Sequence, residues 1–217
     1  MKKNISLVIV ATVFSFCSIP YDLETRYIIE TKLVDSNGNV VPNEKLELYV
    51  DTENNGETIS SSISDKNGLI KMIFPKPDLE NFTFSINNSY NSINGYLNKN
   101  INNIKPDNFI DYKLVLDEIK LVKFDEVTNL TIEINQTSQN KELRQIEIIG
   151  QNYNQYEYLN PIQIPGNYYN LQTYFTLLKN QNFILKYNVY NYTTTVLEEN
   201  NVNLSIAEQP LNYTLTY

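Results

Sequence analysis

Apolar and polar residues alternate with a period of two along most of the chain beyond residue 25. The pattern is clear over 27–33, 46–50 and 130–134, and it is strongest over 183–189 and 211–217. Successive side chains of a β-strand point to opposite faces, so this period predicts half-buried strands and no helices. Alanine is scarce, whereas Ile, Val, Thr, Tyr and Phe are abundant, which also favours strands.

Short polar segments that end in glycine separate the predicted strands. The segments 35–38, 54–56 and 65–68 each combine Asp or Asn with a glycine, which readily adopts the positive φ of a tight turn. Strands and turns at such regular intervals are typical of a β-sandwich. The segment 89–108 is polar and rich in asparagine, and we expect a long loop with one weak strand inside it.

The strand pattern divides into two halves of similar length. We therefore predict an all-β fold with two tandem immunoglobulin-like or transthyretin-like β-sandwich domains, the first over 25–117 and the second, tyrosine-rich, over 118–217. Each half has about the length of an immunoglobulin-like sandwich. The strands on either side of the boundary are nearly continuous, which indicates a short, stiff junction.

Residues 1–16 have the pattern of a secretory signal peptide. Lys2 and Lys3 precede an apolar run that ends at Phe16, and this run is shorter than the ~20 apolar residues that span a membrane. Cys17, the single cysteine of the chain, follows directly. The segment 13–18 resembles a lipobox, which implies that Cys17 carries the lipid anchor and that 17–24 form a tether, although the lipobox has a small residue where Phe16 stands. The alternative is ordinary cleavage, which releases a soluble secreted or periplasmic protein.

The order of strand and turn over 31–50 and 59–74 is a recognisable one. A strand ends at Asp35-Ser36-Asn37-Gly38, Val40-Val41-Pro42 follow, and a second turn, Asp65-Lys66-Asn67-Gly68, joins two further strands. This order resembles the carboxypeptidase-regulatory-like or transthyretin-like (prealbumin-like) domains of bacterial exported lipoproteins. The resemblance implies a β-sandwich over 25–117 with an accessory role, which packs on, spaces or presents another module.

Charge and composition exclude several classes of function. Removal of residues 1–16 takes away two lysines and no acid, so the net charge moves from −8 to −10. Such a chain lacks the basic clusters that bind nucleic acid or anionic lipid headgroups. It contains no histidine and no thiol beyond Cys17, which removes the usual general bases, nucleophiles and zinc ligands. We predict that the protein is not an enzyme and uses no cofactor and no metal.

Two pairs of acidic residues are the remaining candidates for catalysis. Asp51 with Glu53, and Glu198 with Glu199, could act as the carboxylates of a glycoside hydrolase. Both pairs lie in polar segments that we interpret as loops, where solvated acids are the usual finding. The segment 51–57 also clusters oxygen ligands around Gly56 as calcium loops do, but without their spacing.

Eleven of the seventeen tyrosines lie beyond residue 150. Five of them stand among Asn, Gln, Pro and Gly and are predicted to form a contact surface on loops: Tyr153, Tyr156, Tyr158, Tyr168 and Tyr169. Tyrosine is also a common strand former, which is the alternative interpretation. We predict a non-catalytic, lipid-anchored outer-membrane protein that binds another envelope protein. The alternative is a glycan-binding or adhesion module that uses the loop tyrosines.

Overall fold

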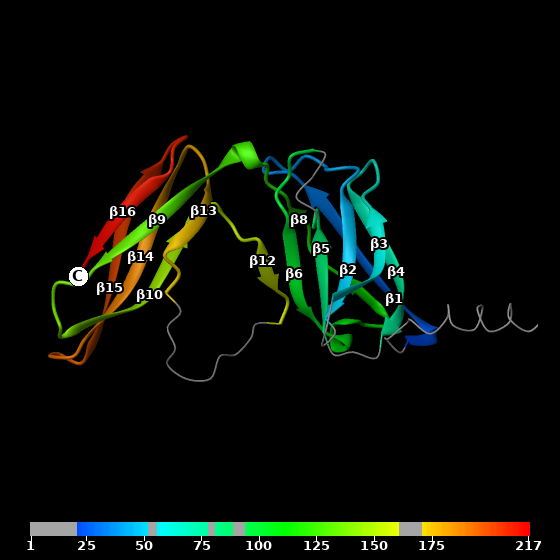
Figure 1. The fold of residues 1–217 in the computed structure, drawn as a ribbon, viewed down its shortest axis with the longest axis horizontal. Helices are drawn as coiled ribbons and strands as arrows, with labels where there is room; N and C mark the ends of the chain where they lie inside the picture. Colours follow the sequence, from blue (N-terminus) through cyan, green and yellow to red (C-terminus); the bar gives the residue numbers. More distant parts are fainter. Residues whose placement is uncertain (1–20, 52–55, 78–80, 89–93, 161–170) are drawn as a thin grey trace, which may run out of the picture.

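The structure is a computed structural model that describes residues 21–51, 56–77, 81–88, 94–160 and 171–217. Over these ranges the chain is built almost entirely from β-strands (Figure 1). No helix in the described ranges is long and apolar enough to cross a membrane. The predicted signal peptide, 1–16, and Cys17 lie outside the described residues.

The first half of the chain contributes eight strands and one short 3₁₀ helix to the described structure. Their bounds are β1 (Tyr21–Val34), β2 (Lys45–Asp51), β3 (Gly56–Ile63), β4 (Leu69–Pro77), β5 (Phe82–Ile86), β6 (Lys99–Ile104), η1 (Pro106–Asn108), β7 (Lys113–Val115) and β8 (Ile119–Lys120).

The second half contributes eight more strands within the described ranges, after the 3₁₀ helix η2 (Phe124–Glu126). Their bounds are β9 (Val127–Asn135), β10 (Lys141–Ile149), β11 (Asn152–Tyr153), β12 (Tyr156–Tyr158), β13 (Tyr174–Leu178), β14 (Gln181–Asn191), β15 (Val196–Ile206) and β16 (Leu211–Thr216).

The N-terminal sandwich encloses its own core between two sheets. One sheet has the order β4-β1-β7, with β8 also paired to β1, and the other has the order β12-β6-β5-β2-β3. Phe74, Phe82 and Phe84 fill the space between them and are almost fully buried. Tyr27 stacks on Phe109 with ring centroids 4.3 Å apart, which closes one end of this core.

The C-terminal sandwich has a separate core between the sheets β10-β14-β15 and β11-β13-β9-β16. The alternation over 183–189 places Phe183, Leu185 and Val189 inside, as the sequence predicts. Leu130 and Leu177 face them from the opposite sheet. The structure confirms the predicted all-β fold with two tandem β-sandwiches, which lie side by side along the long axis of the molecule (Figure 1).

The predicted glycine turns at 35–38 and 65–68 form, whereas most of the predicted turn at 54–56 lies outside the described residues. The backbone amide of Gly68 donates to the backbone carbonyl of Asp65 at 2.9 Å, and Gly68 has a φ of +73°. A Cβ atom on Gly68 would lie 2.5 Å from the carbonyl oxygen of Leu33, so only glycine fits here without a shift of the backbone.

Two boundaries differ from the prediction. β1 begins at Tyr21, inside the predicted tether 17–24, because it pairs with the end of β4. The N-terminal core extends to Leu121, beyond the predicted boundary after 117, because β8 pairs with β1. Within the polar segment 89–108, β6 is the one strand that was expected there, and it pairs with strands on both of its sides.

The strand β12 joins the two halves of the molecule. It belongs to the C-terminal half of the chain but pairs in parallel with β6, so it is the outermost strand of the N-terminal five-stranded sheet. Figure 1 shows β12 between the two sandwiches, beside β6. No pattern in the sequence predicts this connection. The docked β12 nevertheless positions the candidate site.

Candidate functional site

Backbone hydrogen bonds attach β12 to the edge of the N-terminal sandwich. Tyr156, Glu157 and Tyr158 pair in parallel with 100–102 of β6. The Asn100 amide donates to the Gln155 carbonyl at 2.8 Å, and the Leu159 amide donates to the Asn102 carbonyl at 3.0 Å. The edge of β6 is therefore covered by the chain itself, which removes an open row of donors and acceptors.

Asparagine side chains extend this attachment past the end of β12. The side-chain amide of Asn160 donates to the backbone carbonyl of Asn103 and to the side-chain carbonyl of Asn108, each at 2.8 Å. The side-chain amide of Asn103 in turn donates to the backbone carbonyl of Asn160. Asn103 has a φ of +58°, a region that asparagine tolerates better than most residues. These reciprocal bonds fix residue 160 against the N-terminal sandwich.

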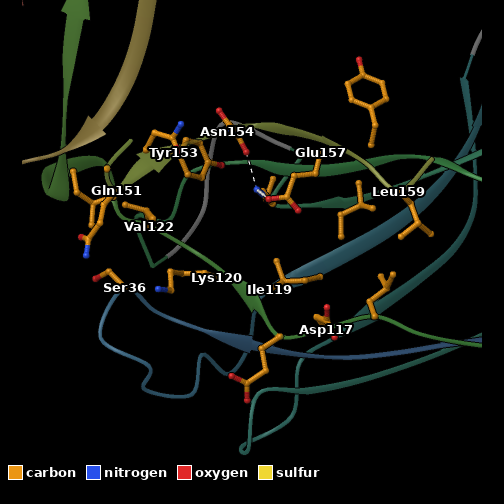
Figure 2. A pocket seen from close by; sticks show the side chains of 18 residues that line it. Ser36, Asp117, Ile119, Lys120, Val122, Gln151, Tyr153, Asn154, Glu157 and Leu159 are labelled. Atoms are coloured by element: carbon orange, nitrogen blue, oxygen red, sulfur yellow. Dashed lines mark hydrogen bonds and ion pairs between the residues drawn. The ribbon is translucent and has the colours of Figure 1, made fainter. Parts of the chain in front are cut away.

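A buried lysine lies under β12. Lys99 is only 5% exposed, and its ammonium group donates to the Asn154 carbonyl at 2.7 Å and pairs with Glu157 at 2.5 Å. A buried charge is tolerated only when it is paired and hydrogen-bonded, and both partners of Lys99 come from the C-terminal half. Figure 2 shows Asn154 and Glu157 at this position.

Tyr153 is a further anchor of the junction. Its hydroxyl donates to the backbone carbonyl of Asn98, and the centre of its ring lies 5.7 Å from the Lys99 ammonium. Burial, with a smaller effect from the nearby charge of Glu157, raises the pKa of Tyr153 well above its usual range. The hydroxyl therefore stays protonated and keeps its role as a hydrogen-bond donor.

One cavity at the junction, which we call the charged cleft, has a volume of about 590 Å³. Figure 2 shows Asp117, Ile119 and Lys120 on one side of it and Asn154, Glu157 and Leu159 on the other. Acidic and basic side chains both line the cleft, and Lys99 with Glu157 already satisfy each other. The charged cleft therefore favours neither an anionic nor a cationic ligand.

A second cavity, which we call the amide pocket, has a volume of about 350 Å³. Its described lining consists of side-chain amides, aromatic rings and one leucine: Asn87, Asn88, Tyr96, Leu97, Asn98, Asn100, Phe124, Tyr153, Gln155 and Tyr156. The two halves of the chain both contribute, so the pocket exists only where β12 is docked.

The predicted contact tyrosines do not share one loop surface. Tyr153 lies in β11 and Tyr156 and Tyr158 lie in β12, not in loops, because these short segments pair with β13 and β6. Tyr153 and Tyr156 line the amide pocket, whereas Tyr153 and Tyr158 line the charged cleft. Tyr168 and Tyr169 lie outside the described residues. The role of these tyrosines in contact with a partner stays a prediction.

A second group of aromatic and charged residues, which we call the distal patch, lies on the outer face of the β10-β14-β15 sheet. Glu142, Tyr190 and Leu197 are neighbours across the three strands. The guanidinium group of Arg144 lies 5.3 Å from the Tyr190 ring and donates to the Tyr192 hydroxyl at 2.9 Å. The Tyr190 and Tyr192 rings meet edge to face with centroids 5.0 Å apart.

Glu142 ties the distal patch together. Its carboxylate pairs with Arg144 at 2.5 Å and accepts the Tyr192 hydroxyl. This hydrogen bond, together with burial and the charge of Glu142, raises the pKa of Tyr192. Tyr192 and Leu197 are nevertheless more than half exposed, so the patch combines fixed geometry with an open surface.

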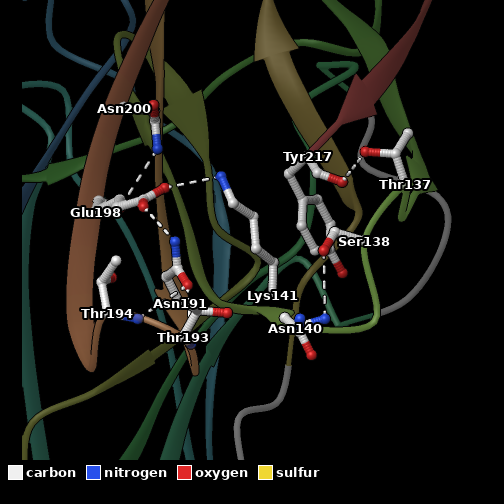
Figure 3. Close-up of polar contacts among 10 residues, drawn as sticks. All are labelled: Thr137, Ser138, Asn140, Lys141, Asn191, Thr193, Thr194, Glu198, Asn200 and Tyr217. Carbon is white, nitrogen blue, oxygen red and sulfur yellow. Dashed lines mark hydrogen bonds and ion pairs between the residues drawn. The ribbon is translucent and has the colours of Figure 1, made fainter.

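A polar network on the opposite face of the sheet supports the turn that carries Tyr192. Glu198 accepts hydrogen bonds from Asn191 at 2.9 Å and from Lys141 at 3.0 Å (Figure 3). Asn191 in turn accepts the backbone amides of Thr193 and Thr194. The hydrogen bond from Asn191 and then that from Lys141 lower the pKa of Glu198.

Of the two candidate carboxylate pairs, the structure describes only Glu198 with Glu199, and these two side chains do not face one site. Glu198 and Glu199 lie in β15, not in a loop as the sequence was interpreted, because β15 pairs with β14 along its length. Adjacent residues of a strand point to opposite faces, and Glu199 pairs with Lys186 on the face away from Asn191. Asp51 ends β2, whereas Glu53 and most of the segment 51–57 lie outside the described residues. No group of three potential metal ligands occurs among the residues that were placed.

Sequence reasoning missed the distal patch and most of the amide pocket. The alternation of Tyr190 and Tyr192 does place both on one face, which is a readable signal. Alternation also places Arg144 on the same face as Glu142, but the pairing of β10 with β14 that brings Arg144 to these rings joins distant segments of the chain.

No protein-family model matches the chain, and no curated protein matches it. Among solved structures, the Bacillus anthracis TIE protein is similar over 88% of this chain and 34% of its own, with 15% identity and a TM-score of 0.33. A 9R-lipoxygenase from Cyanothece is similar over 45% of this chain and 16% of its own, with 18% identity and a TM-score of 0.32. A streptococcal ancillary pilin is similar over 87% of this chain and 62% of its own, with 12% identity and a TM-score of 0.32.

The chain thus spans about a third of the TIE protein, a sixth of the lipoxygenase and less than two thirds of the pilin. At these scores the similarities identify no function for this chain.

The Glu198 network predicts a pH-dependent loss of stability. A lowered pKa in the folded state means that Glu198 stabilises the fold above its ordinary pKa of 4.5, and that this contribution is lost as the pH falls through the folded value. We expect Glu198→Gln to lower the thermal midpoint at neutral pH, and the difference from the unmodified protein to shrink in acid. Thermal melts by circular dichroism between about pH 7 and pH 3 measure this.

The matched control for this experiment is Glu199→Gln, which removes one exposed ion pair from the opposite face. It should change the thermal midpoint less than Glu198→Gln at neutral pH. Equal effects of the two substitutions at every pH would contradict the role given to Glu198.

Proposed function

We propose that this protein is a non-catalytic, exported protein of the cell envelope that binds another envelope protein through the distal patch. The observation that carries this proposal is the pre-arranged cluster of Arg144, Tyr190 and Tyr192 beside the exposed Leu197. Tyrosine and arginine are enriched among the residues that contribute most to protein–protein binding.

The rigidity of the distal patch supports a role in binding. Arg144 and Tyr192 already share hydrogen bonds with each other and with Glu142. A partner that docks here does not have to immobilise these long side chains, so less conformational entropy is lost on association. The Glu198 network holds the turn next to Tyr192 and adds to this pre-organisation.

The proposed location rests on the N-terminal sequence. Residues 1–16 have the features of a signal peptide, and Cys17 stands where a lipoprotein signal is cleaved. A lipid at Cys17 would tether the protein at an outer membrane by the end at which β1 begins. Soluble release after ordinary cleavage is the alternative.

Replacement of the predicted lipid-carrying cysteine tests the anchor. We expect Cys17→Ser to move the protein from the membrane fraction to the soluble fraction, because no thiol is left to carry the lipid. Ser18→Ala, at the neighbouring position, should leave it in the membrane fraction. Mass spectrometry of the unmodified protein should find a diacylglyceryl group on Cys17, and a lipid-free mature N-terminus would contradict the anchor.

Site-specific photo-crosslinking in producing cells tests the partner surface. A photoreactive residue in place of Leu197 should yield one dominant adduct with an envelope protein, since Leu197 borders the distal patch. The matched control is the same residue in place of Ile73, which is also 54% exposed but lies on β4 of the other sandwich.

After the partner is identified, its purified form allows a quantitative comparison. We expect Arg144→Ala to weaken its binding by about tenfold or more, as is typical of a buried arginine in an interface. Equal adducts from both positions, or an affinity that Arg144→Ala leaves unchanged, would contradict the distal patch as the binding surface.

A further inference from the structure

The strand β15 forms a free edge of the sheet β10-β14-β15. One side of β15 pairs with β14 over 196–206, and no other strand in the described ranges pairs with its second side. Figure 1 shows β15 far from the N-terminal sandwich, which therefore does not cover this edge. A free edge presents a row of backbone donors and acceptors to which a strand of another chain can pair.

The other edge strands of the described structure carry features that hinder such pairing. β4 contains Pro75 and Pro77, and the register of β10 is irregular between Leu143 and Gln145. The register of β3 on β2 also shifts, while β7, β8, β11 and β12 have only two or three residues each. Prolines, bulges and short lengths are the usual protection of an edge strand.

β15 lacks these protective features. With 11 residues it is the longest edge strand in the described ranges, and its register with β14 is unbroken. The segment 196–206 contains no proline, lysine or arginine. Its regular backbone is therefore suited to pairing along its whole length.

The two acids of β15 already have counter-charges within the chain. Glu198 pairs with Lys141 at 3.0 Å, and Glu199 pairs with Lys186 at 3.0 Å. A charged side chain on an edge strand normally discourages pairing with another chain. Here each negative charge lies beside a lysine of the same sandwich, so its repulsion of a second strand is reduced.

The sequence of β15 is complementary to itself in one direction. Antiparallel pairing of two copies over 196–206 is centred on Asn201, which then lies opposite its own copy. In this register Glu198 lies opposite Leu204 of the second copy, and Glu199 lies opposite Asn203. No acid faces an acid, whereas parallel pairing in register would set each acid beside its copy, which is destabilising.

The ends and the centre of β15 also match in this register. Val196 is 51% exposed, and it lies opposite Ile206 of the second copy on the same face of the sheet. The symmetry gives this apolar pair twice, once at each end of the paired strands. At the centre, the two Asn201 side chains can donate to and accept from each other.

We propose that β15 is a dimerisation strand, through which two copies of this chain pair edge to edge and antiparallel into one six-stranded sheet. This inference goes beyond the proposed envelope partner. Pairing extends the sheet in its own plane, whereas Arg144, Tyr190 and Tyr192 lie on its outer face. The twofold axis is perpendicular to the sheet, so the dimer presents two distal patches on the same side.

Disulfide trapping of the mature chain, in a Cys17→Ser background, tests the register. Asn201→Cys should form a disulfide-linked dimer under mild oxidation, because opposite residues of antiparallel strands have Cα atoms about 4.5–5.5 Å apart. Asn203→Cys is the matched control, since it is also exposed and on the same face. In the proposed register its two copies are four residues apart along the strands, about 13 Å, which is too far for a disulfide.

Sedimentation equilibrium of the same mature chain measures the dimer without a covalent bond. We expect a concentration-dependent dimer at an ionic strength of about 0.15 M, and a weaker one at low salt because each copy is acidic. Asn201→Lys should weaken dimerisation about tenfold or more, because two lysines would face each other at the symmetry axis. Asn203→Lys, the matched control, would lie opposite Glu199 of the second copy and should preserve the dimer.

Three results would overturn the proposal. These are a folded protein that stays monomeric at every concentration and ionic strength, equal disulfide yields for the two cysteine variants, and equal effects of the two lysine variants. Circular dichroism of each variant confirms that a loss of the dimer does not come from unfolding. A monomer whose residue 201 crosslinks only to a different protein in cells would also contradict self-pairing.

Discussion

The addition of β12 to the open edge of β6 is the interaction on which the arrangement of this molecule depends. It brings a segment of the C-terminal half into the five-stranded sheet of the N-terminal sandwich. With one cysteine in the chain, no intramolecular disulfide can hold the two halves together. Hydrogen bonds from β12, Asn160 and Lys99 therefore take that role. The charged cleft and the amide pocket both exist because this strand is docked.

Asparagine is the residue that makes such a junction feasible. Its side chain both donates and accepts, so Asn160, Asn103 and Asn108 can satisfy one another across the two halves. Asparagine also tolerates the positive φ found at Asn87 and Asn103. The asparagine residues at this junction thus have specific structural roles. The exception is Asn87, whose buried side-chain Nδ2 makes no hydrogen bond.

Much of the fold could be predicted from the sequence, and the reason is physical. Apolar residues at every second position over 183–189 indicate a strand with one buried face. This pattern can be recognised from adjacent residues alone. Turns such as 65–68 are equally local, since Gly68 and Asp65 form them alone. The two cores and the all-β class follow from these two signals.

The candidate site was less predictable because it depends on pairing between distant segments. Tyr156 and Tyr158 lie in a strand too short and too polar to show a pattern, so they were expected in a loop. Glu198 and Glu199 were also expected in a loop, since the apolar alternation of β15 fades where its inner face becomes polar. Arg144 reaches the distal patch because β10 pairs with β14, and local alternation does not predict which distant strands pair.

Amide hydrogen exchange of two residues tests the docking of β12 most directly. The Asn100 amide donates to Gln155 and the Leu159 amide donates to Asn102, so each bond crosses between the two halves of the chain. If β12 is docked, both amides exchange slowly in the native protein, with protection close to that of core strand amides such as that of Leu48. Exchange of Asn100 and Leu159 at the rate of an unstructured peptide, in a protein whose Leu48 amide is protected, would contradict the docked junction and both of its cavities.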